Sequence, residues 1–186
     1  NLYNGTTWSS VNSRMTARNC IGGTGTSTAA LGIGGILSPS IRTCNEEWDG
    51  TDWTTGGPLI TQRVYIGTAG TQNAASGFGG EANNVGTSCH EQYNGTSWSP
   101  GGSMINPRGR FGATGTQNAG LAVGGYGSPG TSLSNTEEYD GSAWTNGGAL
   151  ISSVYSQGVT GTQNAGLSFL GASIPSGNTN KTEEYD

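Results

Sequence analysis

The sequence predicts an all-β protein built from repeats, and three observations carry that prediction. Gly makes up 35 of the 186 residues, no segment shows helical periodicity, and the same phrases return every 45 or 46 residues. So much Gly, Thr, Ser and Asn would suit a flexible chain, but five Trp and seven Tyr at regular spacing supply apolar surface to bury. We therefore expect residues 1–186 to form one folded β domain or a segment of a larger one.

The first phrase is a short aromatic hairpin. It reads NLYNGTTW at 1–8, EEWDGTDW at 46–53, EQYNGTSW at 91–98 and EEYDGSAW at 137–144, and it starts again as EEYD at 183–186. Asn-Gly or Asp-Gly between short alternating runs predicts a two-residue type I′ turn, which would pair Tyr139 with Ser142. Glu137 would then lie across from Trp144, and all four side chains would share one face. The tryptophans that repeat on this face, and that we expect to pack against the neighbouring repeat, are Trp8, Trp53, Trp98 and Trp144.

Two further phrases complete a four-stranded unit. GTSTAA, GTQNAA and two copies of GTQNAG turn a second hairpin, and the strand after it ends in Gly-Gly in three of the four repeats. Each unit then has an antiparallel strand a near an arginine, b ending at the glycine pair, c carrying Glu-x-Tyr and d opening with Trp. The repeats run over about 1–45, 46–90, 91–136 and 137–182, with 183–186 starting a further repeat.

Charged residues keep the same period. The arginines are Arg18, Arg63 and Arg108, with Val154 at the fourth place, and the glutamates on the packed face are Glu46, Glu91, Glu137 and Glu183. Burying a carboxylate without a partner is strongly unfavourable. We therefore predict that each arginine pairs with a strand-c glutamate, within or between repeats.

Four-stranded units at this period are typical of β-propeller blades. The Gly-Gly of strand b, the Glu-x-Tyr of strand c, the Trp of strand d and the arginine before strand a together resemble the kelch repeat over essentially the whole chain. Two departures are a tighter turn between Tyr and Trp and the loss of the fourth glycine pair. The GTQNAG and EQYNGTSW phrasing also resembles kelch-like repeats of tail-fibre and other structural proteins of bacteriophages. Counting strands gives 17, which leaves open a larger ring, a four-bladed ring with a spare strand, or a ring completed by a neighbouring chain.

Composition argues against several classes of function. A net charge of −5 without a basic stripe does not favour nucleic acid, and no apolar run approaches the ~20 residues of a membrane span. His90 is the only histidine, so a His-based metal cluster cannot form, and we see no nucleophile motif. The three cysteines, Cys20, Cys44 and Cys89, form no metal motif, and we expect free thiols. We therefore expect a protein that is not an enzyme and needs neither cofactor nor metal.

The surface that varies between repeats is the one that we expect to bind a partner. The a–b and c–d turns are short and nearly identical, whereas the b–c loops at 36–44, 81–90, 126–135 and 172–181 differ. Binding residues gather in variable loops on a rigid scaffold. The distinctive side chains in these loops are Arg42, Asn83, Asn84, His90, Tyr126 and Lys181.

These features favour a non-enzymatic structural and binding module in a virion fibre or a similar extracellular appendage. We expect its partners to be a host-surface glycan or receptor, other subunits of the particle and further copies of itself. An alternative is a dedicated lectin, because EEWDGTDW and ITQRVY resemble phrases of small fucose-binding propellers that hold sugar with Arg, Glu and Trp. The residues to which this second resemblance points are Arg63, Glu46, Glu91, Trp53 and Trp98. A purely structural spacer without a ligand is the third alternative.

Overall fold

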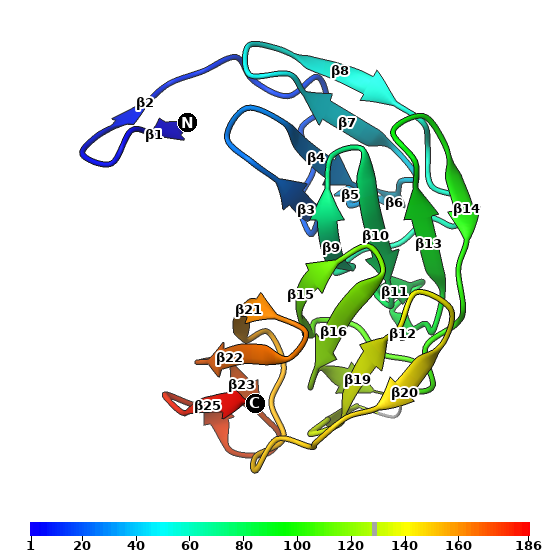
Figure 1. The fold of residues 1–186 in the computed structure, drawn as a ribbon, viewed down its shortest axis with the longest axis vertical. Helices are drawn as coiled ribbons and strands as arrows, with labels where there is room; N and C mark the ends of the chain where they lie inside the picture. The colour runs from blue at the N-terminus through cyan, green and yellow to red at the C-terminus, as the bar shows by residue number, and fades with distance from the viewer. Residues whose placement is uncertain (128–129) are drawn as a thin grey trace.

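The chain folds as an open arc of β-sheets, seen in a computed structural model that describes residues 1–127 and 130–186 (Figure 1). Four antiparallel sheets follow one another along the chain, with strand orders β3-β4-β7-β8, β9-β10-β13-β14, β15-β16-β19-β20 and β21-β22-β25. We call them blades 1 to 4. The predicted all-β, propeller-like repeat architecture is confirmed, and the described residues contain no helix with the length and apolar character of a membrane span.

Blades 1 to 3 run from an inner strand a to an outer strand d, and blade 4 comprises strands a to c. The a strands are β3 (Gly22–Gly25), β9 (Gly67–Thr71), β15 (Gly112–Thr116) and β21 (Gly158–Thr162). The b strands are β4 (Ala30–Ile33), β10 (Ala74–Phe78), β16 (Ala119–Val123) and β22 (Ala165–Phe169). The c strands are β7 (Asn45–Trp48), β13 (His90–Tyr93), β19 (Thr136–Tyr139) and β25 (Thr182–Tyr185). The d strands are β8 (Trp53–Gly56), β14 (Trp98–Pro100) and β20 (Trp144–Asn146), and an N-terminal hairpin, β1 (Leu2–Tyr3) with β2 (Trp8–Ser9), forms a sheet of its own.

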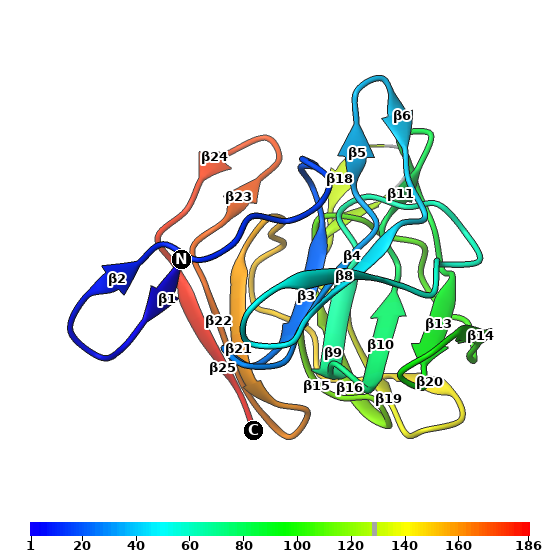
Figure 2. The same ribbon diagram turned by 90° about the horizontal axis from the view of Figure 1, so that it is seen from above.

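The b–c loops contain small hairpins that the sequence did not reveal. They are β5 (Ile36–Leu37) with β6 (Ser40–Ile41), β11 (Glu81–Ala82) with β12 (Val85–Gly86), β17 (Tyr126–Gly127) with β18 (Thr131–Ser132), and β23 (Ala172–Ser173) with β24 (Gly177–Asn178). Figure 2 shows β5–β6 and β23–β24 projecting from the same side of the arc. The predicted loop 126–135 includes residues 128 and 129, which lie outside the described part of the chain.

The predicted two-residue turn of the aromatic hairpin is wrong. Tyr139 pairs with Trp144 rather than with Ser142, and Glu137 pairs with Asn146, so the turn has four residues. The reason lies in the side chain of Asp140, which accepts the backbone N–H groups of residues 142 and 143, each at 2.8 Å, and so stabilises the longer turn. The same two hydrogen bonds lower the pKa of the Asp140 carboxyl. The expected face survives the correction, because Tyr139 and Trp144 still lie side by side with ring centroids 5.2 Å apart.

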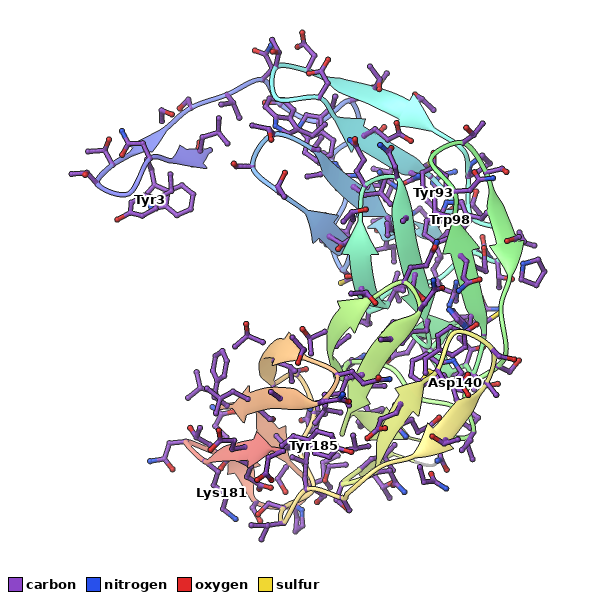
Figure 3. All side chains as sticks on the ribbon, viewed as in Figure 1. Tyr3, Tyr93, Trp98, Asp140, Lys181 and Tyr185 are labelled. Carbon is purple, nitrogen blue, oxygen red and sulfur yellow. The ribbon has the colours of Figure 1, made fainter. Side chains whose placement is uncertain are left out.

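Apolar clusters between blades form the core, as expected for Trp98 and Trp144, whereas Trp8 is 70% exposed and Trp53 is half-buried, so the expected packing is not seen for these two. Tyr93 and Trp98 of blade 2 pack on Leu31 and Ile33 of blade 1, and Figure 3 shows the first two together between the sheets. Tyr139 and Trp144 of blade 3 pack in the same way on Phe78 of blade 2. The aromatic hairpins of blades 2 and 3 therefore each cover the blade that precedes them in the chain.

The glycine pair at the end of strand b is required by the approach of the next blade. Both residues have positive φ, for example 57° at Gly79 and 95° at Gly80, and the Gly80 N–H donates to the Arg108 carbonyl at 2.8 Å. A Cβ on Gly79 would lie 2.6 Å from the Phe111 ring. In blade 4, Leu170 takes the first position of the pair and keeps φ at 62°.

The glutamine of the GTQN phrase fastens one blade to the next. Gln117 of blade 3 donates its side-chain amide to the carbonyls of Ala75 and Tyr93 in blade 2, at 3.0 and 2.7 Å. The equivalent Gln72 and Gln163 make the same pair of hydrogen bonds to blades 1 and 3. Strands b and c of one blade are therefore held by the a–b turn of the following one.

Candidate functional site

The periodic arginines and glutamates form buried ion pairs, as predicted, and each pair lies within one blade. The N···O distances are 2.7 Å for Arg18–Glu46, 2.9 Å for Arg63–Glu91 and 2.5 Å for Arg108–Glu137. Each guanidinium also donates to at least two backbone carbonyls, and each glutamate accepts a backbone N–H from the d–a loop. The arginine therefore ties strand b, strand c and the d–a loop together, which is a structural role.

Most of the residues named for sugar binding lie in this buried framework. Arg63 is 0%, Glu91 2% and Trp98 7% exposed, so in this structure they offer almost no surface to a ligand. Glu46 is also buried, whereas Trp53 is half-buried and lies at an end of the arc. There the Arg14 guanidinium stands 5.2 Å from the Trp53 ring centroid and its Nε lies 3.2 Å from the Glu46 carboxylate, beside a cavity of about 470 Å³.

The loop candidates do not gather at one place. Arg42 is exposed, and Asn83 and Asn84 are the two turn residues of β11–β12 with φ of 53° and 63°, which turn geometry explains. Lys181 is exposed, and its ammonium group donates to the Ser152 hydroxyl at 2.6 Å. Tyr126 opens β17. Among the described residues, no hydrogen bond or ion pair joins any two of the six candidate side chains.

His90 lies elsewhere than the sequence suggested. It is the first residue of β13, not a loop residue, and it is 3% exposed between blades 2 and 3. Its Nε2 lies 2.6 Å from the Ser76 hydroxyl and its Nδ1 lies 3.0 Å from the Gly102 carbonyl. Burial lowers the pKa of the imidazole to about 4, so it is neutral at pH 7, when the Nδ1–H can donate to Gly102 and Nε2 can accept from Ser76.

A cluster around Arg110 is the most ligand-like group that the structure brings together. The Arg110 guanidinium lies 4.5 Å from the Tyr65 ring centroid and 5.5 Å from that of Tyr126. It also donates to both carboxylate oxygens of Glu81, at 2.8 and 3.3 Å, and these hydrogen bonds raise the pKa of the arginine. The Glu81 side chain is 3% exposed, whereas that of Arg110 is 35% exposed and the two tyrosines are half-buried, so the cluster is partly open to solvent.

Two residues of the cluster, Tyr65 and Arg110, occupy a position that has the same left-handed backbone conformation in all four blades. Cys20, Tyr65, Arg110 and Ser156 are the equivalent residues of the four blades, and all have φ between 53° and 56°. Positive φ is uncommon for such side chains. The Tyr65 N–H donates to the Cys20 carbonyl at 3.0 Å and the Ser156 N–H to the Arg110 carbonyl at 2.6 Å, so these residues link neighbouring blades. A hydrogen bond to the Cys20 thiol is the main cause that raises the pKa of the Tyr65 hydroxyl.

Sequence reasoning found only Tyr126 of this cluster. The signal was present, because the blade-linking residues Cys20, Tyr65 and Arg110 each lie two residues after a periodic arginine, at Arg18, Arg63 and Arg108. It was hidden because the side chain differs in every repeat, whereas the backbone conformation is the same.

Comparison of the chain with protein-family models and with curated proteins gives no match. The described residues contain no group of three or more His, Cys, Asp or Glu side chains arranged to hold a metal ion. The three cysteines are free thiols. The described residues therefore form an all-β, propeller-like repeat protein in which a partly exposed arginine lies between two tyrosine rings and is paired with the buried Glu81.

Proposed function

We propose that this chain is a non-enzymatic binding module, kelch-like in its repeats, within a virion fibre or a similar extracellular appendage. Its partner is a glycan or glycan-bearing receptor on a host surface. The observation that carries the proposal is the Arg110 cluster. Tyrosine rings stack on the apolar faces of sugar rings, and a guanidinium held flat by Glu81 offers paired donors to hydroxyl or carboxylate oxygens.

The contrast between contacts that recur from blade to blade and side chains that differ between blades supports this proposal. The ion pairs, glycine pairs and glutamine contacts that build the blades recur, whereas the blade-linking side chains and the b–c hairpins change from blade to blade. A rigid scaffold with varied side chains on one rim is how binding proteins commonly combine precision with specificity. An acidic chain that exposes one arginine between two aromatic rings would favour an acidic or hydroxyl-rich ligand over nucleic acid.

The experiment is a glycan array that includes neutral and acidic bacterial-surface polysaccharides, followed by saturation-transfer NMR with the best binder. We expect contacts at the Tyr65 and Tyr126 rings and at least about tenfold weaker binding by Arg110→Ala. Arg110→Lys should not restore binding, because lysine lacks the planar fork. The control is Thr145→Ala, on the exposed outer strand β20. Binding that Arg110→Ala leaves unchanged would refute this assignment.

A dedicated lectin is the second candidate, and the end of the arc at Trp53 is the place that favours it. Arg14, Glu46 and Trp53 lie together there beside an open cavity, with the residue types that the lectin resemblance points to. Trp53→Ala should abolish sugar binding at this place and leave the Arg110 cluster intact. If the wild-type chain binds no glycan on the array, the structural spacer without a ligand becomes the better hypothesis.

A further inference from the structure

The side chains around Arg110 form a row rather than a single spot. The Arg110 guanidinium lies between the rings of Tyr65 and Tyr126, and the Tyr126 ring in turn contacts that of Tyr155, with centroids 5.6 Å apart at an angle of 67°. The first three residues belong to blades 2 and 3, each of which has another blade on both sides. The row therefore crosses the junction of two blades in the interior of the arc.

Backbone pairing with the b–c hairpins holds the row in place. Tyr126 exchanges two backbone hydrogen bonds with Gly109, at 2.7 and 3.0 Å, and Tyr155 exchanges two with Ala172, at 2.8 and 2.9 Å. Gly109 also makes room for the partner of the arginine, because a Cβ there would lie 2.5 Å from Cγ of Glu81. Side chains fixed in this way lose little conformational freedom when a ligand binds, which favours affinity.

The ion pair in this row is not part of the repeated scaffold. Arg110 and Glu81 join blades 2 and 3, whereas the other blade junctions have uncharged residues at both places. These residues are Tyr65 with Ile36 between blades 1 and 2, and Ser156 with Tyr126 between blades 3 and 4. Because the blades join at those junctions without the ion pair, building the arc does not require it.

The free donors of Arg110 indicate the charge of the ligand. A guanidinium carries five N–H groups. Within the described part of the chain, Nε and Nη2 donate to the Glu81 carboxylate at 2.8 and 3.3 Å, and Nη1 has no partner. The end of the fork formed by Nη1 and Nη2 therefore keeps two parallel donors, whose spacing matches the two oxygens of a carboxylate. A sugar that bears a carboxylate fits this end better than a neutral sugar does.

The tyrosines indicate the length of the ligand. Tyr65 and Tyr126 are half-buried, so each offers part of an apolar ring and a hydroxyl group to a sugar. Their ring centroids lie 4.5 and 5.5 Å from the guanidinium of Arg110, too close for a sugar to enter between them. A ligand must therefore lie along the row, and rings on both sides of the arginine favour a chain whose acidic sugar has a neighbour on each side.

We infer that the row binds an internal stretch of a linear acidic polysaccharide, with a carboxylate-bearing sugar on Arg110 and its two neighbours on Tyr65 and Tyr126. This inference rests on the proposed glycan-binding function and adds the charge and the length of the ligand. A single acidic sugar would occupy only the centre of the row, so its affinity should be lower than that of a longer chain.

The test is an NMR titration with size-defined fragments of hyaluronan, alginate and polygalacturonate, compared with the free uronic acids. We expect the affinity for at least one series to rise about tenfold or more from the single sugar to the hexasaccharide. Reduction of the carboxylates to alcohols should weaken the hexasaccharide about tenfold or more, because the charge-assisted hydrogen bonds to Arg110 are lost.

Variants on both sides of Arg110 test the row itself. Tyr65→Ala and Tyr126→Ala should each weaken the hexasaccharide about fivefold or more, and should affect it more than the free uronic acid. A variant that failed to fold would instead lose both ligands and would change its circular dichroism spectrum. The matched control is Tyr3→Ala, which removes a tyrosine that is 53% exposed and lies on the N-terminal hairpin.

The outcomes separate this inference from the proposed function. Affinity that does not rise with chain length, carboxyl-reduced fragments that bind as tightly as the acidic ones, or tyrosine variants that behave like Tyr3→Ala would each overturn the inference and leave a glycan site at Arg110 in place. A neutral glycan bound on the array while every acidic fragment fails would do the same. If neither the array nor any fragment shows binding, the proposed function itself is refuted.

Discussion

Replacing Arg108 by valine tests the buried ion pair most directly, because the fourth repeat already has Val154 at this position. Arg108 is 0% exposed and donates to the carbonyls of Gly124 and Asn135, at 2.8 and 2.7 Å, as well as to Glu137 at 2.5 Å. The valine would leave all three acceptors without this donor. The buried Glu137 carboxylate would keep only its contacts with the d–a loop, chiefly the N–H groups of residues 105 and 106.

The expected loss of stability is large. Breaking a buried ion pair by removing one partner costs about 3–5 kcal/mol, and each buried carbonyl left without a donor adds about 1–3 kcal/mol. These contributions overlap, so we expect the free energy of unfolding to fall by about 4 kcal/mol or more. In the folded protein burial lowers the pKa of the Arg108 guanidinium, and the neighbouring Glu137 opposes that effect.

The assay is equilibrium unfolding in urea, followed by tryptophan fluorescence and circular dichroism. Arg42→Val, an exposed arginine, is the matched control and should change stability by about 0.5 kcal/mol or less. The double variant Arg108→Val with Glu137→Gln removes the uncompensated charge but keeps an acceptor for the loop, so it should recover about 1–2 kcal/mol. The reasoning fails if Arg108→Val is within about 1 kcal/mol of the Arg42 control.

Three further predictions follow from single contacts. The pKa of His90 is about 4 in the folded protein against an ordinary 6.5, so the unfolded chain binds a proton at this residue more readily between these two pH values. The free energy of unfolding should therefore be highest above pH 6.5 and should fall by up to about 3 kcal/mol as the pH drops toward 4. In an acid titration of stability, His90→Asn should remove most of this pH dependence. Leu170→Gly should raise the melting temperature and increase the free energy of unfolding by about 0.5–1 kcal/mol, because it removes the backbone strain of an exposed leucine held at a φ of 62°. An unchanged melting temperature would mean that this strain is absent. Gln117→Ala should cost about 1–2 kcal/mol by removing two hydrogen bonds between blades, whereas the exposed neighbour Asn118→Ala should cost little; equal effects in urea unfolding would contradict the role of the glutamine.

The four-stranded unit could be predicted because its signals are local or strictly periodic. Asp-Gly and Asn-Gly marked the aromatic hairpin, and the glycine pair and the GTQN phrase marked the ends of strands a and b. The 17 strands a to d that the described residues contain were all anticipated, and this part of the chain adds eight short strands in the b–c hairpins. The Arg–Glu pairing was also predictable, because the arginines and the glutamates recur with the same period, and buried groups of opposite charge are stable only when they pair.

The turn register was not predictable from the Asp-Gly signal alone. A two-residue turn and a four-residue turn use the same residues, and the choice depends on whether the Asp140 carboxylate accepts two backbone N–H groups. His90 was misplaced for a similar reason, because a polar residue at a loop end can turn inward when a neighbouring blade supplies Ser76 and Gly102 as partners.

By itself, the sequence determined the fold class, the repeat and the residues that build each blade, because these depend on spacing along one chain. Only the tertiary structure decided which side chains of different blades meet. The Arg110 cluster joins residues from β11, β17 and the segments before β9 and β15. Such sites arise from contacts between repeats, where the distance in space is short although the distance in sequence is a whole period.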